Sequence, residues 1–232
     1  MIEPSFSVVI PAAGIGKRVG ADIPKQYLTV LGKSIIEHSI IPFLEHANIE
    51  KVIVSIAKND KWFEHLNIAT HPKLSVVEGG KERVDSVMNA LHELESDDYV
   101  LVHDAARPCV QTEDINKLLE HARCNKNGAI LAYRVRDTMK RTEANQRILK
   151  TVEREHLWHA LTPQLFNVQH LANAISSIQE QHLITDEASA IEMSGGEVCI
   201  IEGRSDNLKV TQSEDLLLAE FYLSNFINKE NI

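Results

Sequence analysis

Residues 7–18 constrain the fold of this chain more than any other stretch. Their sequence is Ser7-Val8-Val9-Ile10-Pro11-Ala12-Ala13-Gly14-Ile15-Gly16-Lys17-Arg18. The apolar run predicts a buried strand, and the small residues after it let backbone N–H groups approach a ligand closely. Lys17, Arg18 and Lys25 add positive charge beside this loop. A strand that ends at a small, cationic loop is typical of a phosphate-binding site at the carboxyl edge of a parallel sheet.

The spacing within this loop argues against two familiar nucleotide-binding motifs. A P-loop ends in Gly-Lys-Ser/Thr, whereas Lys17 is followed by Arg18. The dinucleotide-binding fingerprint needs a third glycine, and Val19 stands at that position. The loop therefore favours a triphosphate site of another kind, while an ordinary strand-to-helix turn with a solvated basic edge remains the alternative.

Composition bounds the class of protein. The chain has 232 residues, of which 44% are hydrophobic, and no Pro/Ser/Gly-rich linker divides it, so we expect one domain over residues 1–232. A net charge of −9 would repel nucleic acid and anionic membrane surfaces. Cys109, Cys124 and Cys199 are odd in number and far apart, which argues against a disulfide framework and a zinc site. With no signal-like or membrane-spanning segment, we expect a cytoplasmic protein.

Strand-like and helix-like patterns alternate along the chain, which predicts an α/β fold with a doubly wound, mainly parallel sheet. After the first strand, we expect strands at 51–57, 74–78, 99–104, 129–135 and 197–202. We expect helices at 34–47, 82–94, 112–124, about 167–181, 185–191 and 213–226. Ser34 and Thr112 are the predicted N-caps of two of these helices.

Small and charged residues follow successive predicted strands. Gly80 and Arg83 follow one strand, Asp104 ends another, and Asp206 and Lys209 follow the last. Because the carboxyl ends of parallel strands share one edge of a sheet, we expect these groups to converge there. Mg²⁺ is often held by one or two carboxylates together with substrate phosphates, so the two aspartates are candidate magnesium ligands. A lone Asp after a strand is also a common turn or capping residue.

Residues 136–156 break the alternating pattern. Two strand-like segments, 136–142 and 148–154, flank the polar residues 143–147, which predicts a hairpin that projects from the core. A two-stranded hairpin is marginally stable alone. We therefore expect a homodimer in which this arm is exchanged or clasped, although a flap against its own body is the alternative.

Six segments together resemble the 2-C-methyl-D-erythritol 4-phosphate cytidylyltransferases of the nucleotidyltransferase superfamily. They are residues 9–18, Pro24-Lys25-Gln26-Tyr27, Gly79-Gly80-x-x-Arg83-x-x-Ser86, Val102-His103-Asp104-Ala105-Ala106-Arg107-Pro108, Ala160-Leu161-Thr162-Pro163-Gln164 and Thr185-Asp186-Glu187-Ala188. The resemblance runs over nearly the full chain. It implies Mg²⁺-dependent transfer of CMP from CTP to 2-C-methyl-D-erythritol 4-phosphate, with release of pyrophosphate, in non-mevalonate isoprenoid precursor biosynthesis.

The resemblance also implies a role for each matching residue. Arg18 and Lys25 would stabilise the transition state at the α-phosphorus, and Arg154 and Lys209 would orient the attacking phosphate. The nucleotide would be surrounded by Ala12, Ala13, Gly14, Gly80, Arg83, Ser86, Asp104 and Ala105. The sugar phosphate would be bound by Thr138, Arg154, Thr162, Thr185 and Lys209, with Thr138 and Arg154 reaching in from the partner's arm. The metal would be held by Asp104 and Asp206. A role for Arg107 stays open.

Two other functions fit the same residues less well. One is a cytidylyltransferase for another polyol phosphate, such as ribitol 5-phosphate, because a change in one pocket alters acceptor choice without changing the CTP loop. The other is a catalytically silent nucleotide-binding scaffold, which would need none of Arg18, Lys25, Asp104 and Lys209. The fold alone does not decide among these functions.

Overall fold

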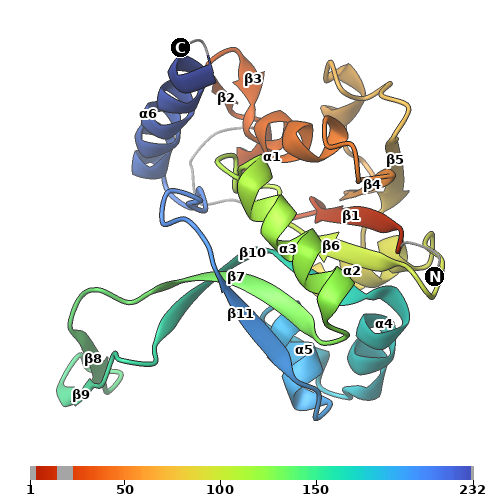
Figure 1. Ribbon diagram of the computed structural model, residues 1–232. Helices are drawn as coiled ribbons and strands as arrows, with labels where there is room; N and C mark the ends of the chain where they lie inside the picture. The colour runs from red at the N-terminus through yellow and green to blue at the C-terminus, as the bar shows by residue number, and fades with distance from the viewer. Residues whose placement is uncertain (1–3, 15–22, 231–232) are drawn as a thin grey trace.

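A seven-stranded sheet in the strand order β11-β7-β10-β6-β1-β4-β5 forms the centre of the molecule (Figure 1). The computed structural model describes residues 4–14 and 23–230. The strands are β1 (Phe6–Pro11), β4 (Lys51–Ile56), β5 (Leu74–Glu78), β6 (Tyr99–Val102), β7 (Gly128–Arg134), β10 (Trp158–Asn167) and β11 (Val198–Glu202). β10 runs antiparallel to both of its neighbours, and the other pairs in this sheet are parallel. The predicted doubly wound, mainly parallel sheet is confirmed.

Helices cover both faces of this sheet because its strands are apolar on both sides. The helices are α1 (Ile35–Leu44), α2 (Arg83–Leu91), α3 (Thr112–Cys124), α4 (Val168–Ser177), α5 (Glu187–Met193) and α6 (Ser213–Glu230). Val8 and Ile10 of β1 pack in the core that contains α1 and α3. Val9 packs in the core that contains α2, α4 and α5.

The helix caps test the expected helix starts. Ser34 caps α1 as predicted, and it forms a capping box with Glu37. Thr112 was expected to cap α3 but is its first helical residue, so that prediction is wrong by one position. The carbonyl of Gln111 already accepts the N–H of Ile115 at 3.2 Å, which makes Gln111 the cap.

The order of the strands contains a switch point beside β1. The chain passes from β1 to β4 and β5 on one side of the sheet, and then returns to β6 on the other side of β1. In open α/β sheets, ligands bind outside the carboxyl ends of the strands at such a point. The loops after β1 and β6 are therefore placed where a ligand site is expected.

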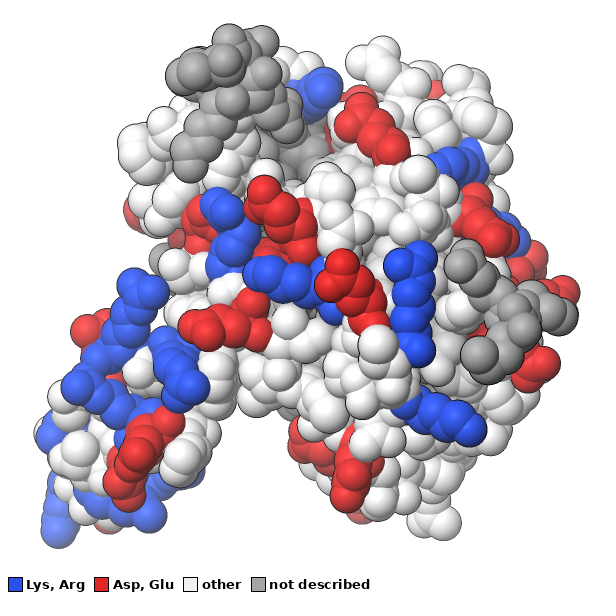
Figure 2. Space-filling model, in the orientation of Figure 1, with Lys and Arg blue, Asp and Glu red and all other residues white. Residues whose placement is uncertain are grey.

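The predicted arm projects away from the central sheet as a separate hairpin (Figure 1). Its strands, β8 (Met139–Thr142) and β9 (Ile148–Val152), pair antiparallel with each other. Apolar side chains are exposed on it, namely Met139, Ile148 and Leu149. Figure 2 shows Lys and Arg side chains gathered on the same arm, at the lower left.

A smaller layer lies beside the first strand's loop. The short helix η2 (Lys25–Tyr27) leads into the hairpin of β2 (Thr29–Val30) and β3 (Lys33–Ser34). A separate apolar cluster joins this hairpin to α6 through Val30, Ile35, Cys109, Val210, Ala219 and Leu223. In the described ranges, none of the helices is both long enough and apolar enough to cross a membrane.

Candidate active site

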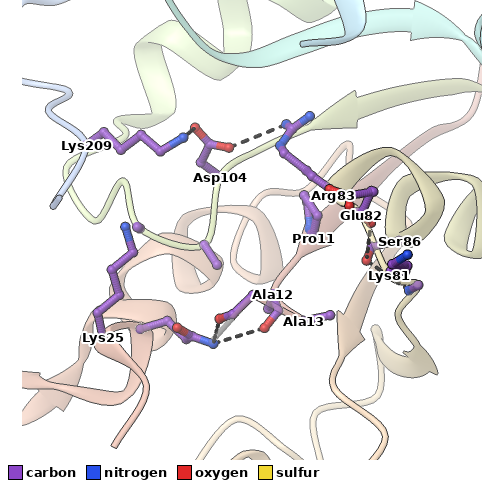
Figure 3. Close-up of a pocket in the computed structure, with 15 residues that line it drawn as sticks. Pro11, Ala12, Ala13, Lys25, Lys81, Glu82, Arg83, Ser86, Asp104 and Lys209 are labelled. Carbon is purple, nitrogen blue, oxygen red and sulfur yellow. Dashed lines mark hydrogen bonds and ion pairs between the residues drawn. The ribbon is translucent and has the colours of Figure 1, made fainter. Parts of the chain in front are cut away.

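A cavity opens at the carboxyl ends of β1, β5 and β6 (Figure 3). All eight residues predicted to surround the nucleotide line it: Ala12, Ala13, Gly14, Gly80, Arg83, Ser86, Asp104 and Ala105. Lys25 and Lys209 line it as well. Arg18, the other predicted transition-state residue, lies outside the described residues. The residues that the family resemblance implied for the nucleotide therefore lie together on one cavity, at the strand ends where the sheet pattern predicted a site.

Two adjacent glycines let the loop after β5 approach the loop after β1. A Cβ atom built on Gly79 would clash with the Cβ of Ala13 and would lie 2.9 Å from Ser86 Oγ. A Cβ on Gly80 would clash with Asp85. The N–H of Gly80 donates to Ser86 Oγ at 3.0 Å. The loop after β5 therefore packs directly against Ala13, and the bond from Gly80 ties that loop to the first turn of α2.

Asp104 lies among three cations from three segments. Its Oδ2 is 2.9 Å from Lys209 Nζ, and its Oδ1 is 3.4 Å from the guanidinium of Arg83 (Figure 3). Oδ2 also lies 3.3 Å from Arg107 Nε. Burial alone would raise the pKa of Asp104, but the charges of Arg83, Lys209 and Arg107 hold that pKa well below its usual range. Asp104 is therefore an ionised carboxylate facing the cavity.

Arg83 forms an ion pair with Glu187, a buried residue for which the sequence predicted no role. Glu187 accepts two hydrogen bonds from the guanidinium, at 2.6 and 3.1 Å, and its side chain is 2% exposed. Burial disfavours the charged form of Arg83, yet Glu187, followed by Asp104 and Asp186, raises the pKa of Arg83 above its ordinary value. Arg83 opens α2 and Glu187 opens α5, so this pair joins the first residues of two helices.

A second cavity adjoins the first and shares Arg83, Asp104 and Lys209 with it. Two predicted acceptor-binding residues, Thr162 and Thr185, line this second cavity. Thr162 Oγ1 also accepts the backbone N–H of Asp104 at 3.0 Å, so it fixes the loop that carries the carboxylate. The shared residues therefore stand between the cavity lined by the predicted nucleotide-binding residues, called here the nucleotide-side cavity, and the one lined by predicted acceptor-binding residues, called the acceptor-side cavity.

Three predicted site residues lie elsewhere in the single chain. Thr138 and Arg154 belong to the arm region and line neither cavity, and the Arg154 guanidinium contacts the carbonyl of Arg136. Asp206 forms an ion pair with Arg204, and the distance from Arg204 Nε to Asp206 Oδ1 is 2.9 Å. Across the described ranges, no cluster of three or more His, Cys, Asp or Glu side chains could hold a metal ion. The structure thus places one predicted metal ligand, Asp104, in the cavity.

Two contacts define the position of the cationic residues further. Lys25 Nζ donates to the carbonyl of Val210 at 2.8 Å. Arg107 donates to the carbonyl of Asn207 at 2.8 Å while its Nε contacts Asp104. Arg107 therefore joins the loop after β6 to the loop after β11. No feature of the sequence pattern indicated this contact, because the two residues are far apart in the chain.

The fold and the site together define an α/β nucleotidyltransferase. The chain belongs to the 2-C-methyl-D-erythritol 4-phosphate cytidylyltransferase family, whose model matches residues 6–225. A protein of that name from Pseudoalteromonas atlantica is 53% identical over 221 residues, covering 95% of this chain and 96% of the relative. The Vibrio cholerae relative of that name is 51% identical and covers 97% and 98%. The crystal structure of the Francisella tularensis protein of that name is 36% identical, with a TM-score of 0.80, covering 94% and 99%.

Proposed function

We propose that this protein transfers CMP from CTP to 2-C-methyl-D-erythritol 4-phosphate, forming 4-diphosphocytidyl-2-C-methyl-D-erythritol and pyrophosphate in the non-mevalonate route to isoprenoid precursors. The observation that carries the proposal is the pair of adjoining cavities that share Arg83, Asp104 and Lys209. Such an arrangement suits a reaction that joins two bound substrates. Family membership supports the identity of both substrates.

The chemical obstacle is repulsion between two anions. The acceptor phosphate is already a nucleophile, so no covalent enzyme intermediate is needed. The barrier arises from the electrostatic repulsion between this phosphate and the triphosphate as the two approach. Positioning and charge neutralisation supply most of the catalysis of phosphoryl transfer, and the same applies to nucleotidyl transfer. Lys25 and Lys209 line the cavity and Arg83 faces both cavities, so cationic side chains surround the space where the two phosphates would meet.

Mg²⁺ fits the donors of this site when substrate phosphates complete its coordination. Oδ2 of Asp104 forms ion pairs with both Lys209 and Arg107. Among the described residues, Oδ1 has only the 3.4 Å contact with Arg83. An oxygen of this kind suits a hard cation that usually keeps water and phosphate ligands. Bound Mg²⁺ would neutralise charge on the triphosphate. Asp206 is a second ligand only if it exchanges Arg204 for the metal.

We further propose that the enzyme is a cytoplasmic homodimer whose arms are exchanged. The exposed apolar residues Met139, Ile148 and Leu149 give the arm a surface that a partner would cover. Exchange would bring Thr138 and Arg154 of one chain to the acceptor cavity of the other. The arm is also rich in cations, which suits contact with a phosphate substrate.

Pyrophosphate release with a panel of acceptors tests the proposal. Wild-type protein with CTP and Mg²⁺ should release pyrophosphate with methylerythritol phosphate, and only at background level with ribitol 5-phosphate or with no acceptor. Release with ribitol 5-phosphate alone would assign the enzyme to another polyol phosphate. Calorimetric binding of CTP without turnover of either acceptor would identify a nucleotide-binding scaffold instead.

A further inference from the structure

Gln26 lies beside the loop that follows β1 and lines the same cavity. Its side chain is buried, with the residue 4% exposed, and Nε2 donates to the carbonyl of Ala12 at 3.0 Å and to that of Gly14 at 3.2 Å. Carbonyl oxygens only accept hydrogen bonds, so the end of the carboxamide that faces both of them is the NH₂ group. One side chain therefore uses its two amide hydrogens on two carbonyls of the same loop.

These bonds determine which polar groups the loop presents to the cavity. The C=O and N–H groups of a trans peptide point in opposite directions. Because the carbonyl of Ala12 is turned towards Gln26, the N–H of Ala13 is turned away from it. Ala13 and Gly14 line the cavity, and within the described part of the chain their N–H groups have no hydrogen-bond partner. The N–H of Ala12, by contrast, still donates to Ser55 at 2.8 Å.

The short helix that carries Gln26 is itself fixed. The next residue, Tyr27, is buried, donates to Asp60 at 2.7 Å and stacks on Trp62 at a ring-centroid distance of 5.6 Å. The preceding residue, Lys25, lines the cavity. The same turn therefore supplies a cation to the site and anchors the carbonyls of the opposite loop segment.

We propose that Gln26 is a positioning residue that sets the polarity of the loop after β1. By binding the two carbonyls it keeps their negative ends paired, and by orienting the peptide after Ala12 it leaves the N–H of Ala13 for a hydrogen-bond acceptor atom of CTP. Free carbonyls turned into the cavity would repel the triphosphate. This inference rests on the proposed function only in taking CTP as the ligand.

Two substitutions separate this role from simple packing. In Gln26→Met the shape is nearly kept but the donors are lost, and we expect the Kd for CTP to rise about fivefold to thirtyfold, as expected for one or two lost hydrogen bonds. In Gln26→Glu a carboxylate faces two carbonyls, so the rise should be larger. Gln169→Glu is the matched charge control, because Gln169 is exposed on α4, and its Kd should equal that of the wild type.

Calorimetry with CTP, without acceptor, measures this effect directly. In parallel, KM for methylerythritol phosphate at saturating CTP should stay within about twofold, because Gln26 lines the nucleotide-side cavity and not the acceptor-side cavity. A Gln26→Met protein that binds CTP as the wild type does would overturn the inference. An equal loss of affinity for CTP and for methylerythritol phosphate would also overturn it. If Gln26→Glu does not fold, Gln26→Met alone tests the inference.

Comparison of CTP with CMP locates the acceptor atoms. If Gln26→Met loses more affinity for CTP than for CMP, the acceptor atoms lie on the two phosphates that CMP lacks. If it loses equal affinity for both, the acceptor atoms lie on the CMP part of CTP. Both results support the inference. Weakened CTP binding in this variant, combined with a wild type that binds CTP but transfers nothing, would support the role of Gln26 and contradict the proposed function. The two proposals can therefore fail separately.

Discussion

At the level of single residues, the charge of the site depends on two buried carboxylates, Asp104 and Glu187. Asp104 faces the cavity and Glu187 stands behind Arg83. Each neutralises a cation that burial would otherwise penalise. A substitution at either position therefore acts on binding and on stability together.

Glu187→Gln should weaken both. Arg83 loses its charged partner and is left with Asp104, 3.4 Å away, as the nearest carboxylate. We expect the free energy of unfolding to fall by roughly 2 kcal/mol, the order for a buried hydrogen bond to a charged group, with a tenfold or greater loss in kcat/KM. Glu192→Gln, an exposed substitution on the same helix, is the control for steady-state assays and denaturant unfolding. Equal behaviour of the two variants would contradict the role of Glu187.

His103 makes stability dependent on pH. It is fully buried, with its ring nitrogens 3.0 Å from Thr162 Oγ1 and 3.1 Å from the carbonyl of Arg107, and burial lowers its pKa to about 4. In the unfolded chain the value is about 6.5, so between pH 6.5 and 4 the unfolded state takes up a proton that the folded state does not. Stability should therefore fall by roughly 3 kcal/mol across that window as the pH falls. Asp104 adds a loss below about pH 4, because its lowered pKa stabilises the fold above that range.

Denaturant unfolding at several pH values between 7 and 5 checks this expectation. The slope of the unfolding free energy against pH should be shallower in His103→Gln than in the wild type, because the variant lacks the titrating group. The comparison of slopes removes the contribution of the other ten histidines. Parallel slopes would show that His103 does not cause the acid sensitivity.

At the level of elements, the site depends on close approach between the loops after β1 and β5. Gly79→Ala should separate them, because the new Cβ would clash with Ala13. We expect the Kd for CTP to rise at least about tenfold with a lower melting temperature, as for an overpacked site. Gly195→Asn is the matched control, since Gly195 has φ +84° with no atom within 4 Å of a built Cβ, and Asn tolerates that backbone. CTP binding by Gly79→Ala at wild-type affinity would contradict this account.

Most elements could be predicted from the sequence, because their signals are local. Apolar periodicity located the strands and helices, and the strand ends indicated which loops would meet. The strand β10 was not predicted, since Pro163 lacks a donor and the pairing with β7 shifts register between Ala160 and Gln164. The bonds of Gln26 to the loop and of Arg83 to Glu187 were also missed. The residues in these bonds are separated in the sequence and belong to no pattern that indicates the contact. Only the three-dimensional structure therefore identifies these bonds.

At the level of the whole molecule, the proposed arm exchange means that a single chain lacks part of its site. Mixing two inactive variants, Lys25→Ala and Arg154→Ala, tests arm exchange. In a mixed dimer, one site then combines an intact Lys25 with an intact Arg154 from the partner. If half of the dimers are mixed and each has one working site, activity should recover to about a quarter of the wild type.

The mixing experiment needs subunit exchange, so the two variants are unfolded and refolded together, with each variant refolded alone as the control. No recovery in a mixture shown to contain mixed dimers would mean that each arm serves its own chain. Sedimentation at the assay concentration establishes the assembly state. Activity in a monomeric species would also contradict arm exchange.

The transfer itself is tested by measuring both products of one reaction. Wild-type protein is incubated with CTP, Mg²⁺ and methylerythritol phosphate, and pyrophosphate and the cytidine product are quantified by mass spectrometry. We predict equal amounts of pyrophosphate and 4-diphosphocytidyl-2-C-methyl-D-erythritol. Pyrophosphate accompanied by free CMP, or no conversion by protein that binds CTP, would contradict the assignment of this site to cytidylyl transfer.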